Sequence, residues 1–249
     1  MKWLRTIIVF DKGNILGSSD LRLLHDSYVR SIASIDHPAG AGTLTLRRKE
    51  RKNEDQKDSD WLRNGVNFLR ARFLEHMTTE GGWRAELNVE LNPDHAPPQL
   101  KLYPSLKSYQ EPVGSKFGQF DFLTTGPSGL KFAIEWETGN ISSSHRSMNK
   151  LAIALANRLI DVGVLIVPSR ALYEHLTDRI GNVQELSGYL EMWHGLGDAI
   201  DSGVLAITVV EHDELTDDPS VPFLSVGKDG NAKKASKVKA ERRQKPKSV

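Results

Sequence analysis

The chain has 249 residues with a formal net charge of +1, and its 39% hydrophobic and 26% charged residues are ordinary for a globular protein. This length is sufficient for one domain with a buried core, and no apolar run approaches the roughly 18–20 residues that span a bilayer. The chain has no cysteine, which excludes disulfides, a cysteine-based zinc site and a thiol nucleophile, and we expect a cytoplasmic protein.

The first predicted element is a buried strand over residues 6–10. This apolar run also resembles the core of a signal peptide, but it is too short, and Asp11-Lys12-Gly13 follows where a small-residue cleavage site is needed. Residues 19–35 carry an apolar stripe that predicts an amphipathic helix. Residues 43–46 alternate between threonine and leucine, which indicates a short strand.

The next segment, residues 47–60, is nearly all charged and predicts an irregular loop. Residues 61–77 then predict a helix, because apolar side chains recur at helical spacing. Residues 88–112 contain five prolines. They favour an extended connection with one edge strand near residues 100–103.

The second half of the chain alternates between apolar strands and helices. The predicted elements are a hairpin of strands 119–124 and 131–138 with a turn at 126–129, a helix over 143–159, a strand over 162–167, helices over 169–176 and 183–193, and a strand over 204–210. Strands with helices before and after them predict an α/β fold, with a central mixed β-sheet flanked by helices on both faces.

The end of the chain differs from the rest in charge. Residues 228–247 contain nine basic and two acidic residues, a charge of +7 against −6 for the remainder. A basic end of this kind indicates either a polyanionic partner or a solvated terminus, and charge alone leaves both open. We predict a single domain over residues 1–226 and a basic C-terminal tail over residues 227–249.

Three carboxylates stand at the predicted hairpin. Alternate side chains of a strand share a face, so Ile134 and Trp136 are expected to point into the core, and Glu135 and Glu137 to point together to the other side. Asp121 lies on the preceding strand. Three carboxylates that converge repel one another unless a proton or a divalent cation neutralises part of their charge. Mg²⁺ suits such a site because it favours carboxylate and phosphate oxygens as ligands. Spacing alone also allows a strand face on which the glutamates are merely solvated.

A helix start follows these carboxylates directly. Residues 138–143 (TGNISS) lead into the helix that carries Arg146. The first turn of a helix offers free N–H groups and a positive dipole end, which suit a phosphate or the edge of a base. A simple helix cap explains Asn140 and Ser142 equally well.

The stretch 135–151 (EWETGNISSSHRSMNKL) closely resembles the corresponding segment of the BamHI-type restriction endonucleases. Residues 176–186 are also similar, and residues 227–231 more loosely so. The resemblance is dense from about residue 134 to 190 and sparse before residue 118. It implies a restriction-endonuclease-like fold and the chemistry of the PD-(D/E)xK nuclease group, in a variant where glutamate replaces the final lysine.

The resemblance also implies catalytic roles. By similarity, Asp121 and Glu135 hold Mg²⁺, and Glu137 orients or deprotonates the water that attacks the phosphodiester in line, which leaves a 5′-phosphate. A fourth acidic ligand precedes these three in the family. Glu86 is the candidate here, although Ala85 can equally hold that position.

The same resemblance assigns DNA recognition. By similarity, Asn140, Ser142 and Arg146 face the major groove, and Asp178 and Arg179 contact the outer base pair. The chemistry fits, because arginine pairs with guanine O6 and N7 and aspartate accepts from cytosine N4. A surface ion pair is the alternative for the last two residues.

Together these residues imply cleavage of double-stranded DNA at the palindrome GGATCC, with four-base 5′ overhangs. A palindromic target implies a two-fold homodimer in which each subunit cuts one strand, and no membrane is involved. Two other functions stay open. One is a sequence-specific DNA-binding homologue without turnover, and the other is a repair or mobility endonuclease that acts on branched or damaged DNA.

Overall fold

A computed structural model of the chain describes residues 1–51, 61–90, 116–177 and 180–225. Its centre is a six-stranded sheet in the order β1-β9-β8-β7-β6-β5. The strands are β1 (Lys2–Lys12), β5 (Arg84–Glu90), β6 (Lys116–Thr125), β7 (Lys131–Trp136), β8 (Val162–Pro168) and β9 (Gly203–Glu211). Strands β7, β8 and β9 are parallel, and the other three pair antiparallel, which confirms the predicted mixed sheet and the predicted hairpin.

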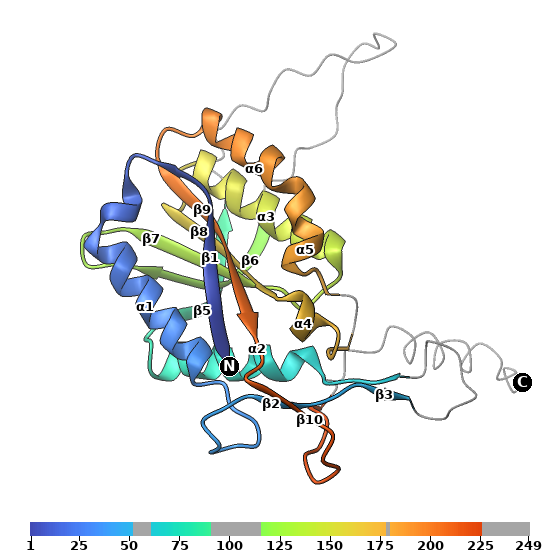
Figure 1. Cartoon of the computed structure of the whole chain (residues 1–249). Helices are drawn as coiled ribbons and strands as arrows, with labels where there is room; N and C mark the ends of the chain where they lie inside the picture. The colour runs from blue at the N-terminus through green and yellow to red at the C-terminus, as the bar shows by residue number, and fades with distance from the viewer. Residues whose placement is uncertain (52–60, 91–115, 178–179, 226–249) are drawn as a thin grey trace, which may run out of the picture.

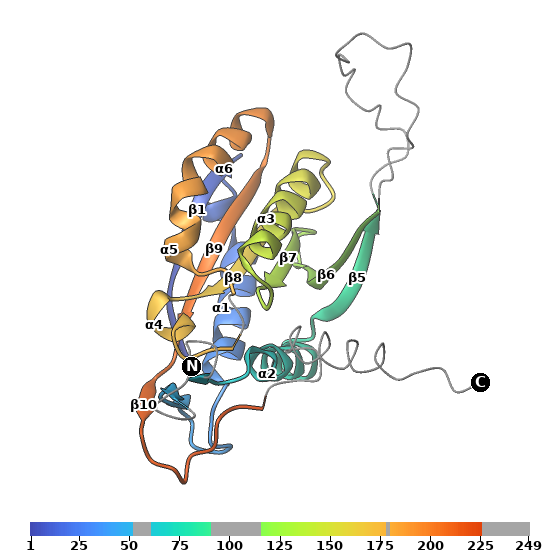
Figure 2. The ribbon, with the colours of Figure 1, turned by 90° about the vertical axis from the view of Figure 1, so that its right-hand side faces the viewer.

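Helices cover both faces of this sheet (Figures 1 and 2). They are α1 (Ser19–Ala33), α2 (Val66–Thr79), α3 (Ile141–Ala156), α4 (Arg170–Tyr173), α5 (Val183–Leu186) and α6 (Leu190–Leu196), with 3₁₀ turns η1 (Ile15–Gly17), η3 (Ser187–Tyr189) and η4 (Gly197–Ala199). The helices α1, α2 and α4 pack on one face, and α3, α5 and α6 pack on the other. The predicted α/β architecture is therefore confirmed.

Each face of the sheet has its own hydrophobic core. On the α1–α2 side, Tyr28, Phe73 and Phe122 are fully buried. On the α3–α6 side, Leu155 and Trp193 are buried to the same degree. Because successive residues of a strand point to opposite faces, the sheet contributes side chains to both cores. The central strands of the sheet are therefore covered on both sides.

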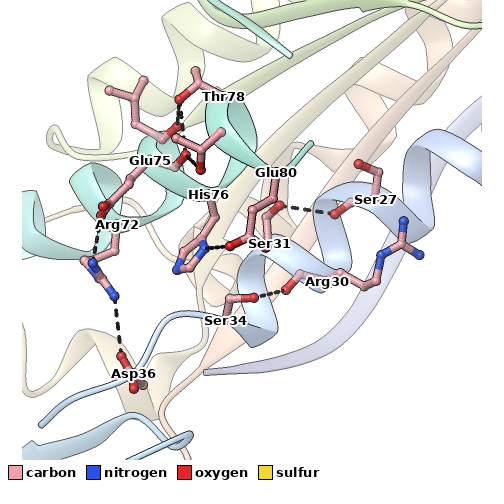
Figure 3. A network of polar contacts seen from close by, with 12 residues as sticks. Ser27, Arg30, Ser31, Ser34, Asp36, Arg72, Glu75, His76, Thr78 and Glu80 are labelled. Carbon is pink, nitrogen blue, oxygen red and sulfur yellow. Dashed lines mark hydrogen bonds and ion pairs between the residues drawn. The ribbon is translucent and has the colours of Figure 1, made fainter. Parts of the chain in front are cut away.

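Polar contacts surround the packing of α1 against α2 (Figure 3). Arg72 of α2 pairs with Glu75 at 2.7 Å and with Asp36, just after α1, at 3.6 Å. His76 lies 3.4 Å from Glu80 at the end of α2. Glu75 and Glu80 are exposed, so their pairs with Arg72 and His76 contribute less than about 1 kcal/mol each. Of these pairs, only that of Arg72 with the buried Asp36 connects α2 to the segment after α1.

The first strand differs from its prediction. β1 extends over Lys2–Lys12 instead of residues 6–10 and forms an edge of the sheet, paired with β9 alone. Ile8 is 38% exposed, whereas Val9 and Phe10 are buried. An edge strand has a neighbour on one side only, so part of its apolar run stays at the surface. The prediction of a buried strand is therefore right only for the last two residues of that run.

Two small sheets replace part of the predicted loop and helix. Strand β2 (Thr45–Arg47) pairs with β10 (Glu214–Thr216), and β3 (Glu50–Arg51) pairs with β4 (Trp61–Leu62). The helix predicted from residue 61 therefore begins only at Val66, the first residue of α2. Its start is delayed by the buried Asn64, whose side chain bonds three backbone groups of distant segments and holds the preceding chain extended.

Four described strands, β3, β4, β5 and β10, were not expected from the sequence pattern. The edge strand predicted near residues 100–103 lies outside the described residues, and so does the predicted tail 227–249. The division into one domain over residues 1–226 and a tail stays a prediction. Among the described helices, none combines the length and the apolar character that crossing a membrane requires.

Candidate active site

Strands β6 and β7 bring Asp121 close to Glu135. In their antiparallel register Phe122 pairs with Ile134. Asp121 precedes Phe122 on β6, and Glu135 follows Ile134 on β7. The two carboxylates therefore lie next to each other on neighbouring strands, where the pairing of β6 with β7 ends. Ile134 and Trp136 face the core as expected. The hairpin thus carries two carboxylates at one strand end, 14 positions apart in the sequence.

Both oxygens of Asp121 have partners. Oδ2 accepts the backbone N–H of Trp136 at 2.7 Å, a bond across the two strands. Oδ1 accepts from the guanidinium of Arg70, on α2, at 2.6 Å. The carboxylate is 17% exposed, so both bonds are partly shielded from water. Asp121 is therefore held in one orientation, by the backbone on one side and by a cation on the other.

Glu135 is a buried carboxylate, with 7% of its surface exposed. Burial raises its pKa to about 7, against the lowering effect of the Lys150 ammonium beside it. Lys150, on α3, forms an ion pair with Oε1 of Glu135, but this oxygen has no hydrogen bond of good geometry. The expectation that this strand face is merely solvated is wrong for Glu135, because α3 covers it.

Glu137 follows β7 directly and is buried as well. Its backbone N–H donates to the carbonyl of Ile166 at 3.0 Å, which continues the pairing with β8. Oε1 accepts the N–H of Gly139 at 2.5 Å, while Oε2 is a buried oxygen without a hydrogen-bond partner in the described chain. Burial raises the pKa of Glu137, and the nearby Ser144 hydroxyl opposes this shift.

The turn after Glu137 requires glycine at position 139. A Cβ on Gly139 would lie 3.2 Å from Oε1 of Glu137 and would overlap the side chain of Ser143. The approach to Ser143 is closer than real Cβ atoms come to their neighbours, and the approach to Glu137 is tight. The absence of a side chain therefore lets the turn close onto the carboxylate and start α3 immediately afterwards.

Glu86 lies across the strand pair from Asp121. Its neighbours Ala85 and Leu87 pair with Phe122 and Phe120, so Glu86 stands opposite Asp121. Its φ of 54° is left-handed, a conformation that is costly for a residue other than glycine and is common at functional sites. Ala85, the alternative candidate, packs against the hydrophobic core instead.

The described residues contain no ready-made group of three acidic or histidine side chains around one point where a metal ion could sit. Asp121 is engaged by Arg70, and Glu135 by Lys150. The chemistry of the donors nevertheless fits a hard cation. Glu135 and Glu137 are buried oxygen ligands with raised pKa values, and Oε2 of Glu137 has no hydrogen-bond partner. A divalent cation would offset their charge.

The start of α3 presents the predicted recognition residues. Asn140 caps the helix, and its Oδ1 accepts the N–H groups of Ser142 and Ser143 at 3.0 and 3.3 Å. Ser142 and Arg146 are exposed and lie one helical turn apart. The capping role that the sequence allowed is therefore present, and it uses only the side-chain oxygen of Asn140. Asp178 and Arg179 lie outside the described residues.

Sequence reasoning missed the basic residues of this site. Arg70 contacts Asp121 from 51 positions away, and Lys150 pairs with Glu135 from the neighbouring helix α3. Lys150 also donates to the carbonyl of Gln119 at 2.8 Å. No local pattern marks either residue, since each side chain meets its carboxylate only in the folded protein.

Comparison with known proteins identifies the family of this chain. Residues 1–231 match the family described as restriction endonuclease BamHI. This protein belongs to the BamHI family. It is 30% identical over 232 residues to the type II restriction enzyme OkrAI of Oceanobacter kriegii. The aligned region covers 93% of this chain and 99% of that enzyme. Family membership confirms the predicted resemblance and the predicted enzyme class, site-specific deoxyribonuclease.

A second relative of this BamHI-family chain is the type II restriction enzyme BamHI of Bacillus amyloliquefaciens. The two are 35% identical over 107 residues, which is 43% of this chain and 46% of that enzyme. Among solved structures, the restriction endonuclease BglII in complex with a DNA 16-mer aligns with a TM-score of 0.46 and 8% identity. That alignment covers 84% of this chain and 79% of the BglII chain.

Proposed function

We propose that this BamHI-family enzyme cuts both strands of DNA at the palindrome GGATCC, with Mg²⁺ as cofactor, and leaves four-base 5′ overhangs. The observation that carries the proposal is the placement of Asp121 beside Glu135 at the end of a strand pair, with the buried Glu137 in the turn that opens α3. Such an enzyme acts in the cytoplasm on DNA that enters the cell.

Each carboxylate has its own role in the proposed reaction. Asp121 and Glu135 would hold Mg²⁺, and Glu86 is the further carboxylate within reach of the same edge. A bound Mg²⁺ supplies charge neutralisation at the scissile phosphate. Lys150 opposes the protonation of Glu135 and so limits the rise of its pKa that burial causes.

Glu137 accepts the proton of the attacking water. Burial raises its pKa, which brings its basicity closer to neutral pH, where a general base works best. The water oxygen bonds to phosphorus while the bond to the 3′ oxygen breaks on the opposite side. The 3′ oxygen leaves as an alkoxide and takes a proton from solvent water, so the products are a 5′-phosphate and a 3′-hydroxyl.

Sequence recognition is proposed to come from the exposed start of α3 and from the segment after α4. Asn140, Ser142 and Arg146 would contact base edges in the major groove, and Asp178 and Arg179 would contact the outer G·C pair. The N-terminal end of a helix next to the carboxylates supports this division, because it places base contacts and phosphate chemistry on one surface.

Arg179 is expected to discriminate the outer guanine. Because a bidentate contact to guanine is lost, Arg179→Ala should reduce discrimination at that position by roughly 1–3 kcal/mol. The measurement compares equilibrium binding in Ca²⁺ to GGATCC and to a duplex with a changed outer pair. An equal loss of affinity for both duplexes would assign Arg179 a structural role instead.

The proposed homodimer is supported by an exposed apolar surface on α3, η3 and α6. Its members are large side chains at least 41% exposed: Ile153, Tyr189, Met192 and Leu196. The two helices pack side by side, since Trp193 donates to Asn149 at 3.2 Å (Figure 1). Exposed apolar side chains on two helices that pack side by side are typical of a protein interface.

Met192→Asp is expected to dissociate the dimer. Met192 is 53% exposed on α6, and a carboxylate buried between two copies would weaken association by at least about 30-fold. Light scattering after gel filtration measures the mass. The matched control is Leu23→Asp, a 51% exposed position on α1, which should stay dimeric. A dimeric Met192→Asp variant would place the interface elsewhere.

The function itself is tested with two plasmids that differ by one base pair in a single GGATCC site. The enzyme in Mg²⁺ should linearise only the intact site, and the mapped ends should carry 5′ overhangs. Cleavage at another hexamer would overturn the proposed specificity. Specific binding without cleavage in Mg²⁺ or Mn²⁺ would favour a homologue without turnover, and cleavage of branched DNA alone would favour a repair or mobility endonuclease.

A further inference from the structure

Arg70 connects the carboxylates of two neighbouring strands. It lies on α2, with Nη2 2.6 Å from Oδ1 of Asp121 and 3.6 Å from Oε1 of Glu86. In the described chain, its polar contacts all go to these two carboxylates. One guanidinium therefore supplies the positive charge that this acidic edge needs.

The position of Arg70 conflicts with a cation at Asp121. Oδ2 of Asp121 is bound to the backbone N–H of Trp136, and this bond is part of the strand pairing. The other oxygen, Oδ1, is the one that Arg70 contacts. A cation that approaches Oδ1 meets a positive charge already in contact with it, and like charges at one oxygen repel. Arg70 and the cation therefore compete for the same atom.

Lys150 at Glu135 differs from Arg70 in how it is anchored. Its Nζ also donates to the backbone carbonyl of Gln119 at 2.8 Å and lies 4.8 Å from the centre of the Phe120 ring. Its side chain is 13% exposed, against 28% for Arg70. A long side chain without a backbone anchor can swing its charged end into water. Arg70, unlike Lys150, can therefore move away from the carboxylate that it contacts.

We propose that Arg70 is a built-in counterion of the cation site, which neutralises Asp121 and Glu86 in the metal-free protein and is displaced from Asp121 when a divalent cation binds. Arg70 is a positioning residue in this scheme, because it acts on the carboxylates and not on the DNA. The inference rests on the proposed function, since it takes Asp121 as a cation ligand.

The test compares Arg70→Met with the wild-type protein. Methionine keeps the apolar stem of the side chain and removes the charge. Free Mn²⁺ is followed by electron paramagnetic resonance in titrations without DNA, and melting temperature is measured in EDTA and in saturating Mn²⁺. The matched control is Arg72→Met, two positions along α2, which pairs with Asp36 and Glu75 (Figure 3) and contacts neither Asp121 nor Glu86 in the described chain.

The expected result has two parts. Arg70→Met should bind Mn²⁺ about 5- to 100-fold more tightly, the range of a typical coupling between two sites. It should also melt at a lower temperature than wild type in EDTA but not in saturating Mn²⁺, because the cation replaces the lost charge. Arg72→Met should leave the affinity unchanged. Unchanged or weaker Mn²⁺ binding by Arg70→Met would overturn the inference.

Two further variants keep the test decisive. Arg70→Lys retains the charge, so Mn²⁺ affinity close to wild type supports displacement of a cation, and affinity as tight as that of Arg70→Met contradicts it. Asp121→Asn separates this inference from the proposed function. If Asp121→Asn binds Mn²⁺ as well as wild type, the proposed cation site is wrong. If it loses binding while Arg70→Met is unchanged, only the inference about Arg70 fails.

Discussion

Glu137→Gln is expected to lower the single-turnover cleavage rate by about 10²–10⁴-fold, the usual contribution of a general base. Glutamine has the same shape and can still accept the N–H of Gly139, which Glu137 accepts at 2.5 Å. It cannot take a proton from water. Specific DNA binding in Ca²⁺ should therefore stay within a few-fold of wild type, because the start of α3 is undisturbed.

The control for this variant is Glu75→Gln. Glu75 lies on α2, is 57% exposed and pairs with Arg72. It should cleave at the wild-type rate, because it loses a surface carboxylate far from the hairpin. A Glu137→Gln enzyme that cleaves at more than about a tenth of the wild-type rate would exclude Glu137 as the base. Loss of both binding and cleavage would mean that Glu137 supports the fold of the turn.

A second large effect is expected in the pH dependence of stability. Burial raises the pKa of Glu135 to about 7 in the folded protein, against 4.5 for an ordinary glutamate. Between these values the folded chain keeps a proton that the unfolded chain has lost. The favourable contribution of Glu135 to the free energy of unfolding is therefore complete below pH 4.5. It is lost as the pH rises through about 7, and it is worth on the order of 3 kcal/mol.

Glu135→Gln isolates this contribution, because glutamine resembles the protonated acid at every pH. Buried histidines change stability in the opposite sense, since burial lowers the pKa of His175 and His212, but they are common to both proteins. Urea unfolding in EDTA should show the wild type losing up to about 3 kcal/mol relative to the variant between about pH 5 and pH 8. A constant difference would contradict the raised pKa.

The sequence predicted the elements that carry the site because their signals are local. The hairpin of β6 and β7 is visible as two alternating apolar segments around a glycine-rich turn, and α3 has both a cap and an apolar stripe. The closeness of Glu135 and Glu137 was visible for the same reason, although β7 ends at Trp136 and Glu137 lies just after it. The predictions failed where distant segments decide the structure. Asn64 delays the start of α2, and β10 forms only by pairing with β2.

The amino-acid sequence by itself predicted the family, most strands and helices of the central sheet, and the hairpin that carries Asp121 and Glu135. The tertiary structure alone decided how those carboxylates are neutralised. Arg70 and Lys150 arrive from helices on opposite faces of the sheet, and they meet Asp121 and Glu135 only when both helices pack. An ion pair between distant residues has no periodicity to reveal it, because its energy depends on separation in space and not along the chain.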